Sequence, residues 1–271
     1  DLNISLNGET FCWAETVKDV RWGNRDWSVV RVYNPDKKIY RLITKKTRYM
    51  SPSISPDGSR IAAVELTEEL DSYIVILNAE SGEEISRFAE PPGAAPSQTC
   101  WSDDGRAVIY VRQNDWMKSL QILYPESGIN NSLTQPSVYN ISDPAVSDGT
   151  VFYISEQTGI ESIYTVPADS VEQQGEQLVA RPFGTASPAP AVHRLDFADY
   201  SKDGFSAVFV EHKSLNTTST ADSAHIDYFE PISDQEPAAG MAGPGKNPAA
   251  DAAADYRIKD YYPALGIFNF H

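Results

Sequence analysis

The sequence predicts an all-β fold, a β-propeller built of four-stranded blades, of which about five are visible. A turn of the form Ser-x-Asp-Gly, followed by a short apolar strand, recurs along the chain. The turn glycines are 50, 47 and 44 residues apart, at Gly8, Gly58, Gly105 and Gly149. This spacing is close to the roughly 40 to 50 residues of one blade. Each turn also begins a series of short β-branched and aromatic runs without helical periodicity, so spacing and composition indicate the same fold.

Four copies of the turn and its strand are clear. They are SLNGETFCWAE (5–15), SPDGSRIAAVE (55–65), SDDGRAVIYVR (102–112) and SDGTVFYISE (147–156). In such a turn Pro fixes φ, Asp accepts local backbone hydrogen bonds, and Gly takes the positive-φ position. We therefore interpret Asp57, Asp104 and Asp148 as turn residues rather than metal ligands. We interpret the strand after each turn as the inner strand of its blade.

A fifth copy is found by aligning PAPAVHRLDFADY (188–200) with DPAVSDGTVFYISE (143–156). This alignment places His193 and Arg194 at the Asp-Gly position of the turn. It also makes SKDG (201–204) a hairpin between two strands. The alternative, in which SKDG is itself the repeated turn, puts the flanking strands out of phase.

Further strands complete each unit. A second strand follows the first after a turn, as in SYIVILNAE (72–80), and a polar turn such as ESGE leads to a third, EISRFA (84–89). A short edge segment precedes the next Ser-x-Asp-Gly turn. Four short strands per unit make one propeller blade.

The composition limits the partners of the chain. With 22 Lys and Arg against 38 Asp and Glu in 271 residues, the formal net charge is −16. A protein of this charge repels polyanions, so we expect no nucleic-acid partner. The two cysteines, Cys12 and Cys100, lie in strand-like apolar contexts of different repeats. This favours two buried thiols over the alternative, a disulfide.

The composition changes after the repeats. We predict propeller blades over residues 1–232 and an Ala/Pro/Gly-rich acidic loop or linker over 233–255. The aromatic C-terminal segment, 256–271, is either a docked strand or the lead-in to a following module. Since only five units can be counted, we expect part of a ring of six or more blades. The alternative is a closed five-bladed ring in which residues 2–5 complete the last blade.

The repeat Pro-x-apolar-Ser-x-Asp-Gly resembles that of the TolB-like (WD40-like) β-propellers over about residues 5–230. It stands at Pro52–Gly58 and, one residue shorter, at Pro144–Gly149. In addition, WAETVKDVRWGNRDW (13–27) and YYPALGIFNFH (261–271) are similar to segments of the propeller module in large Gram-negative outer-membrane-associated proteins. These resemblances imply a periplasmic or outer-membrane-associated location, with the membrane reached only through other modules of a longer chain. TolB-like propellers serve as docking platforms, as lids on peptidases and occasionally as enzymes.

The sequence carries none of the local motifs of common catalytic sites. It has no His-Glu-x-x-His, no Gly-x-Ser-x-Gly and no phosphate-binding glycine loop. Its four histidines are scattered and no two have ligand spacing. We therefore predict no catalytic residue, no metal and no cofactor in this chain, and we expect that it is not an enzyme.

The candidate binding residues are those expected around one mouth of the propeller channel. Strand-end residues at equivalent positions are Glu15, Glu65, Arg112 and Glu156. The long first loop (16–26) adds Asp19, Arg21, Trp22 and Arg25, and the corresponding loop of another blade adds Trp116. Arg and Trp dominate interaction hot spots. The alternative for the first loop is an Arg-Asp-Trp cluster that pins it between blades.

Taken together, these features predict a non-catalytic interaction propeller of the bacterial cell envelope. It would bind a protein, peptide or glycan at one face of the ring. The alternative is a substrate-gating propeller of a larger hydrolase or peptidase whose catalytic domain lies outside this chain.

Overall fold

The computed structural model describes residues 4–8, 10–22, 25–191 and 194–211. The chain divides into two compact units, Asp1–His225 and Ile226–His271. All described residues belong to the first unit. The predicted linker (233–255) and aromatic segment (256–271) lie outside the described residues, and the predicted boundary at residue 232 stays a prediction.

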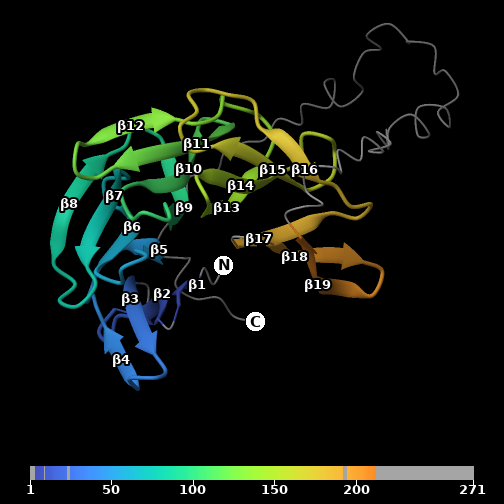
Figure 1. Ribbon diagram of the computed structural model, residues 1–271. Coiled ribbons are helices and arrows are strands. Elements are labelled where there is room, and N and C mark those ends of the chain that lie inside the picture. Colours follow the sequence, from blue (N-terminus) through green and yellow to red (C-terminus); the bar gives the residue numbers. More distant parts are fainter. Residues whose placement is uncertain (1–3, 9, 23–24, 192–193, 212–271) are drawn as a thin grey trace, which may run out of the picture. The chain divides into compact units, whose positions relative to one another are not determined.

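The described residues form nineteen strands and no helix, arranged as five antiparallel sheets (Figure 1). Blade 1 contains β1 (Ile4–Asn7), β2 (Thr10–Lys18), β3 (Asp26–Asn34) and β4 (Ile39–Leu42). Blade 2 contains β5 (Tyr49–Ile54), β6 (Arg60–Leu66), β7 (Ser72–Asn78) and β8 (Glu84–Ala89). Blade 3 contains β9 (Ala95–Trp101), β10 (Val108–Asn114), β11 (Met117–Tyr124) and β12 (Ile129–Ser132). Blade 4 contains β13 (Ile141–Ser147), β14 (Thr150–Ser155), β15 (Ser162–Pro167) and β16 (Glu176–Val179). Blade 5 contains β17 (Thr185–Ala191), β18 (Arg194–Ser201) and β19 (Gly204–Glu211).

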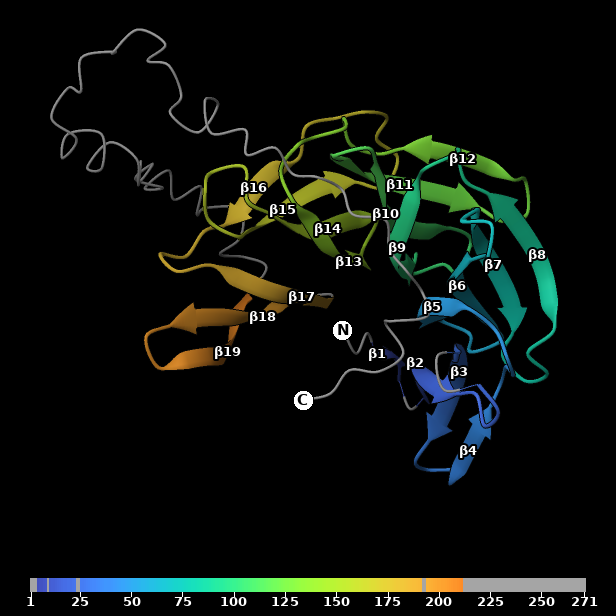
Figure 2. The same ribbon diagram turned by 180° about the vertical axis from the view of Figure 1, so that it is seen from behind.

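Each sheet pairs its strands in chain order, and successive sheets follow one another around an axis (Figure 2). This arrangement confirms the predicted all-β propeller. The register of the fifth unit is also confirmed. Ala191 at the end of β17 pairs with Arg194 at the start of β18, and Ser201 pairs with Gly204 across the hairpin from β18 to β19.

The prediction that the strand after each turn is the inner strand is wrong. The strand before the turn is innermost: β5, β9, β13 and β17 lie nearest the axis and contact one another from blade to blade (Figures 1 and 2). The strand after the turn is the second of its sheet. Its small residues, such as Ala62 and Ala63, are fully buried because both faces of that strand are covered by neighbouring blades.

The turn chemistry follows the prediction in blades 2 and 3. The Asp57 carboxylate accepts hydrogen bonds from both serines of its turn, including one of 2.6 Å from the Ser59 hydroxyl. Gly58 has φ 73°. In blade 4 the turn is two residues shorter. Residues 56–59 and 103–106 separate the paired residues in blades 2 and 3, whereas Asp148 and Gly149 alone join β13 to β14, with φ 49° and 69°. This two-residue turn with both residues at positive φ is typical of a tight hairpin.

Apolar clusters fill the space between successive blades. The cluster between blades 1 and 2 contains Cys12, Val30, Ile61 and Ala63, and similar clusters join each later pair. Cys12 and Cys100 are both free thiols, and burial raises the pKa of each to about 12.

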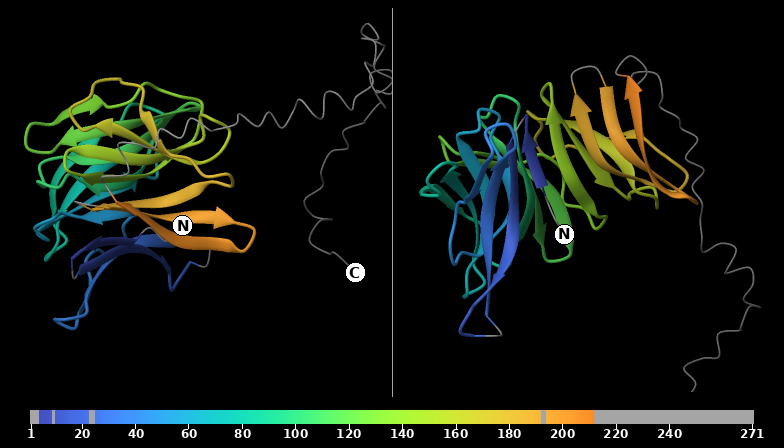
Figure 3. Two further views of the ribbon diagram at one scale, coloured as in Figure 1. Left: turned by 45° about the vertical axis from the view of Figure 1, so that its right-hand side comes forward. Right: turned by 90° about the horizontal axis from the view of Figure 1, so that it is seen from below.

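Blade 1 packs on blade 2, and blade 5 packs on blade 4. The opposite face of each of these two sheets is turned away from its neighbour (Figure 3). Within the described residues, no pair of strands in extensive contact links blade 1 with blade 5. The outer face of blade 1 exposes Leu6, Tyr33 and Tyr40, and that of blade 5 exposes Phe205 and Phe209. Two apolar sheet faces are therefore uncovered in the described part of the chain.

One glycine marks a close approach between blades 1 and 2. Gly82 has φ 75°, and a Cβ at this position would lie 2.1 Å from the backbone oxygen of Ile43. No side chain fits there without moving the backbone.

Candidate functional site

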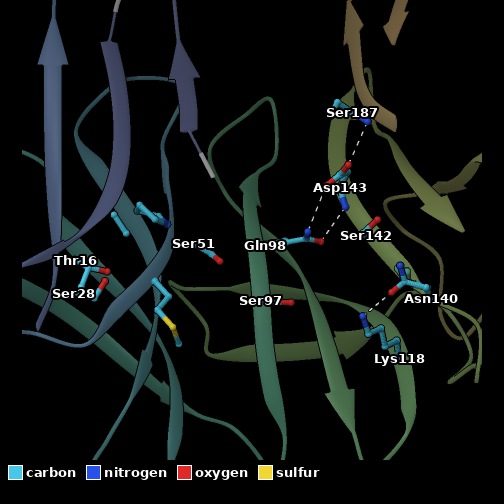
Figure 4. Close-up of a pocket in the computed structure, with 14 residues that line it drawn as sticks. Thr16, Ser28, Ser51, Ser97, Gln98, Lys118, Asn140, Ser142, Asp143 and Ser187 are labelled. Atoms are coloured by element: carbon cyan, nitrogen blue, oxygen red, sulfur yellow. Dashed lines mark hydrogen bonds between the residues drawn. The ribbon is translucent and has the colours of Figure 1, made fainter. Parts of the chain in front are cut away.

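A cavity of about 800 Å³ lies on the axis, between the innermost strands. All five blades contribute to its wall: Ala14, Thr16, Ser28, Met50, Ser51, Pro52, Ser97, Gln98, Lys118, Asn140, Ile141, Ser142, Asp143 and Ser187. Its labelled polar side chains are drawn in Figure 4. Thr16, Ser28 and Lys118 lie next to the hairpins between second and third strands. The cavity is therefore at the end of the propeller that the sequence assigns to ligand binding. We call it the channel cavity.

Four residues of the channel cavity share an uncommon backbone conformation. Ser51, Gln98, Asp143 and Ser187 have φ of 46°, 52°, 51° and 51°. Each lies where the pairing between the innermost and second strands breaks register. A left-handed non-glycine residue costs on the order of 1–3 kcal/mol and is found preferentially at ligand clamps and other functional sites. Bulges of this kind re-aim a side chain, and here they repeat in four blades around one cavity.

We call these four residues the left-handed ring. Hydrogen bonds connect three of them across blade boundaries (Figure 4). The backbone N–H of Asp143 donates to Oε1 of Gln98 (2.9 Å), and Nε2 of Gln98 lies 3.4 Å from Oδ1 of Asp143. The second carboxylate oxygen of Asp143 accepts from the backbone N–H of Ser187 (3.2 Å). Nearby, Nζ of Lys118 donates to Asn140 (2.6 Å). The ring is thus built and oriented by its own contacts.

Two of the predicted strand-end residues form ion pairs within their own sheets. Glu15 pairs with Arg31 of the neighbouring strand. Glu65 lies 2.8 Å from Arg87, and burial raises the pKa of this carboxyl. Neither glutamate lines the channel cavity.

Arg112 belongs to a buried polar network between blades 2 and 3. Its guanidinium donates to Glu90 (Nη2 to Oε1, 3.1 Å) and to Gln121 (2.8 Å). Glu90, whose side chain is 0% exposed, also accepts from the Tyr110 hydroxyl (2.6 Å). Asn130 donates to that hydroxyl at 2.7 Å. The geometry makes Arg112 part of the packing between blades and does not place it at the channel wall.

Glu156 is not equivalent in space to Glu65 and Arg112, because in blade 4 the strand begins to pair one residue after the turn glycine, whereas in blades 2 and 3 it begins two residues after it. Phe152 and Ile154 pack toward blade 5, whereas Ile61 and Val108, at the position aligned with Phe152, pack toward the preceding blade. A shift of one residue moves a strand's side chains to the other face. Glu156 lies just beyond β14 and accepts a hydrogen bond from the backbone of Asn140 (3.2 Å).

The first loop combines a pinned base with an exposed tip. Asp19 accepts from the backbone N–H groups of Arg21 (2.8 Å) and Trp22 (3.1 Å), and the bond from Arg21 is the main cause of its lowered pKa. Arg25 pairs with Glu68 of the next blade (3.4 Å). Trp22 is 59% exposed, with the Arg21 guanidinium 5.5 Å from its ring centroid. Asp19 and Arg25 hold the loop, and Arg21 and Trp22 present its surface.

Trp116 occupies the tip of the hairpin between β10 and β11 and is 77% exposed. Its role in binding, like that of the other residues named from the sequence, stays a prediction. The described residues contain no group of three or more His, Cys, Asp or Glu side chains that could hold a metal ion. In the same part of the chain no helix is long and apolar enough to cross a membrane.

The sequence matches no protein-family model and no curated protein. Similar solved structures are nevertheless found. A putative TolB from Agrobacterium tumefaciens is 18% identical, with a TM-score of 0.61 over 78% of this chain and 76% of that one. TolB from Acinetobacter baumannii is 14% identical, with a TM-score of 0.56 over 78% of this chain and 51% of that one. The β-propeller domain of the Trilobed protease from Pyrococcus furiosus is 13% identical, with a TM-score of 0.52 over 77% of this chain and 80% of that one.

The chain has the fold of a TolB-like β-propeller. At these identities the likeness is one of fold, and this chain spans about half of the Acinetobacter protein. The fold is shared with a propeller domain of a protease as well as with TolB.

The left-handed ring of this TolB-like propeller has a signal in the sequence that our interpretation missed. Ser51, Gln98 and Asp143 each stand four residues before the serine of the following turn. Ser51, Asp143 and Ser187 also each precede a proline, although a residue before proline prefers extended backbone at negative φ.

Proposed function

We propose that this chain is a non-catalytic interaction propeller of the bacterial cell envelope that binds a protein, peptide or glycan at the channel cavity. The observation that carries the proposal is the polar wall of that cavity. It is about 800 Å³ in volume and is ringed by four left-handed residues from four blades. This volume is within the usual range of ligand sites.

The chemistry of the wall suits a ligand rich in amide or hydroxyl groups. Serine, glutamine and asparagine side chains both donate and accept hydrogen bonds. Among the described residues of the wall, one is basic, Lys118, and one is acidic, Asp143. A main-chain peptide segment or a neutral sugar presents matching groups. A polyanion would be repelled by a chain of net charge −16.

Two parts of the proposal depend on the sequence rather than on the cavity. The envelope location comes from the resemblance to TolB-like propellers and to Gram-negative outer-membrane-associated proteins. The absence of catalysis comes from the missing sequence motifs.

The second candidate is a substrate-gating propeller of a larger peptidase. It is supported by the likeness in fold to the propeller domain of the Trilobed protease. It is also supported by the position of the channel cavity on the axis, where a peptide chain would pass.

The test is a variant that fills the cavity. Ser142 lies on β13 and lines the cavity, so Ser142→Trp is expected to block it. The control is Asn131→Trp, on the exposed outermost strand of blade 3. On peptide and glycan arrays the wild-type chain is expected to select a set of ligands. Ser142→Trp should lower their affinity at least ten-fold, and Asn131→Trp should change it less than two-fold. Wild-type binding by Ser142→Trp would overturn the proposal.

The peptidase alternative makes a different prediction with the same variant. In the complete natural polypeptide, blocking the channel should slow cleavage of long peptides and spare that of dipeptide substrates. Equal rates for both variants on long peptides would exclude the gating role.

A further inference from the structure

A second cavity, of about 410 Å³, lies on the outer face of blade 1, away from the channel cavity. Its floor contains Val17, Trp27, Val29 and Leu42. Val17 pairs with Trp27 across β2 and β3, and Arg31 pairs with Leu42 across β3 and β4, so the side chains share one face of the sheet. The opposite face, with Val30 and Val32, packs on blade 2. We call this second cavity the blade 1 pocket.

The wall of the blade 1 pocket is strongly basic. Lys18, Arg21, Arg31, Lys45 and Lys46 line it, against a single acidic residue, Asp19. Asp19 already accepts hydrogen bonds from the backbone of its loop, and its second oxygen lies 3.3 Å from Nε1 of Trp27. Arg31 is paired with Glu15. Within the described residues, the other four cations form no ion pair.

This charge is unusual for the chain, which has sixteen more acidic than basic residues. Carboxylates are abundant, yet Asp19 is the single one among the described residues of this wall, and the four cations around the apolar floor form no ion pair with it. A neutral apolar ligand would leave those cations partly desolvated and unpaired, which is costly. An anionic group on the ligand would pair with them and form charge-assisted hydrogen bonds.

The floor is held in place before any ligand binds. Nε1 of Trp27 donates to Asp19, and the Arg25 guanidinium lies 4.4 Å from the centroid of the Trp27 ring. Arg25 is itself paired with Glu68. A preformed apolar surface with a few convergent polar groups is the usual form of a small-molecule site.

We propose that the blade 1 pocket binds a small amphipathic organic anion, with an aromatic or aliphatic body and one acidic group. The body lies on Trp27, Val29 and Leu42, and the acidic group lies among Lys18, Arg21, Lys45 and Lys46. This site is separate from the channel cavity and does not depend on the function proposed for it.

The experiment compares two probes that differ in one charged group. The anion 8-anilinonaphthalene-1-sulfonate and neutral N-phenyl-1-naphthylamine carry the same rings, and only the first has a sulfonate, which represents the ligand's acidic group. Titration calorimetry and fluorescence are expected to show one anion bound per chain, at least ten-fold tighter than the neutral probe. Decanoate should displace it, and decanol should not.

Matched lysine pairs locate the site. Lys45→Gln/Lys46→Gln is expected to weaken binding of the anionic probe at least five-fold. Lys37→Gln/Lys38→Gln, at an exposed turn of the same blade, should leave it within two-fold. Both pairs remove two positive charges, and each contains one residue with positive φ, Lys46 at 52° and Lys38 at 51°. The control therefore matches the charge change and the local backbone.

Three results would overturn the proposal. Equal affinity for the two probes would show that the cations take no part. If both lysine pairs weakened binding of the anionic probe equally, the effect would come from the overall charge of the chain and not from the pocket. If neither probe bound, the pocket would not be a small-molecule site, and its face would be left for a protein partner.

Discussion

Removing the Arg112 guanidinium should destabilise the propeller more than removing any exposed arginine. Arg112→Ala deletes the hydrogen bonds to Glu90, Gln121 and the Tyr110 hydroxyl. It leaves the carboxylate of Glu90, which is 0% exposed, without its cation. Breaking a buried pair by removing one partner costs about 3–5 kcal/mol. Because the Tyr110 hydroxyl still donates to Glu90, we expect the lower end of that range, about 3 kcal/mol.

For a chain of this size, about 3 kcal/mol corresponds to a fall in Tm of about 6–12 °C. The assay is urea and thermal unfolding followed by tryptophan fluorescence at pH 7. Arg106→Ala is the control, because Arg106 is 82% exposed and its pair with Asp104 spans 3.8 Å. An exposed pair of this kind contributes less than about 1 kcal/mol.

A double variant tests whether the cost comes from the orphaned carboxylate. Glu90→Gln/Arg112→Met should lose less stability than Arg112→Ala alone, because no buried charge remains. Two results would show that the network does not hold blades 2 and 3 together as described. One is that Arg112→Ala unfolds like Arg106→Ala. The other is that the double variant loses as much free energy of unfolding as Glu90→Gln and Arg112→Met lose in sum when each is made alone.

Three further outcomes follow from the turns and the thiols. Hydrogen bonds from the turn serines hold the pKa of Asp57 at about 2, below its value in the unfolded chain. The ionised carboxylate therefore adds to the free energy of unfolding above pH 4, and this stabilisation is lost as the pH falls toward 2. In urea unfolding, Asp57→Ala should therefore cost about 1 kcal/mol at pH 7, after allowance for solvent screening, and almost nothing at pH 2. Gly149→Ala, at positive φ in open space, should cost about 1 kcal/mol, and Gly82→Ala several times more, because only the second meets a backbone oxygen. Equal losses of stability in the two variants would contradict the close contact between position 82 and the backbone oxygen of Ile43. Cys12 and Cys100 should react with Ellman's reagent at pH 8 only after unfolding in guanidinium, and fast labelling of the native chain would contradict their burial.

Much of the fold could be predicted from the sequence because local chemistry repeats. The spacing of Gly8, Gly58, Gly105 and Gly149 identifies the blade length, and the turn chemistry explains Asp57. The order of strands within a blade could not be predicted in the same way. A run such as Ile-Ala-Ala-Val fits equally well a strand next to the axis and a strand covered on both faces by neighbouring blades.

The surroundings of the predicted site residues could be predicted from the sequence less well than the fold, for two physical reasons. The face on which a strand residue lies depends on where pairing begins after the turn glycine. In blade 4 it begins one residue earlier, which removed Glu156 from the set that contains Glu65 and Arg112. Partners distant in the chain were also invisible: Glu90 precedes Arg112 by 22 residues, across a blade boundary. The repeated position four residues before the turn serine, at Ser51 and Asp143, was the readable signal for the channel cavity.

Contact between a partner and the channel cavity can be detected by site-specific photo-crosslinking in the cells that naturally make the protein. A photoreactive phenylalanine replaces Ser142 or Ser97 in the cavity wall, or Asn131 on the outer edge as control. If partners bind at the channel cavity, discrete crosslinked species are expected from the two wall positions and none from position 131. Crosslinks from position 131 alone, or the same species from all three positions, would contradict it.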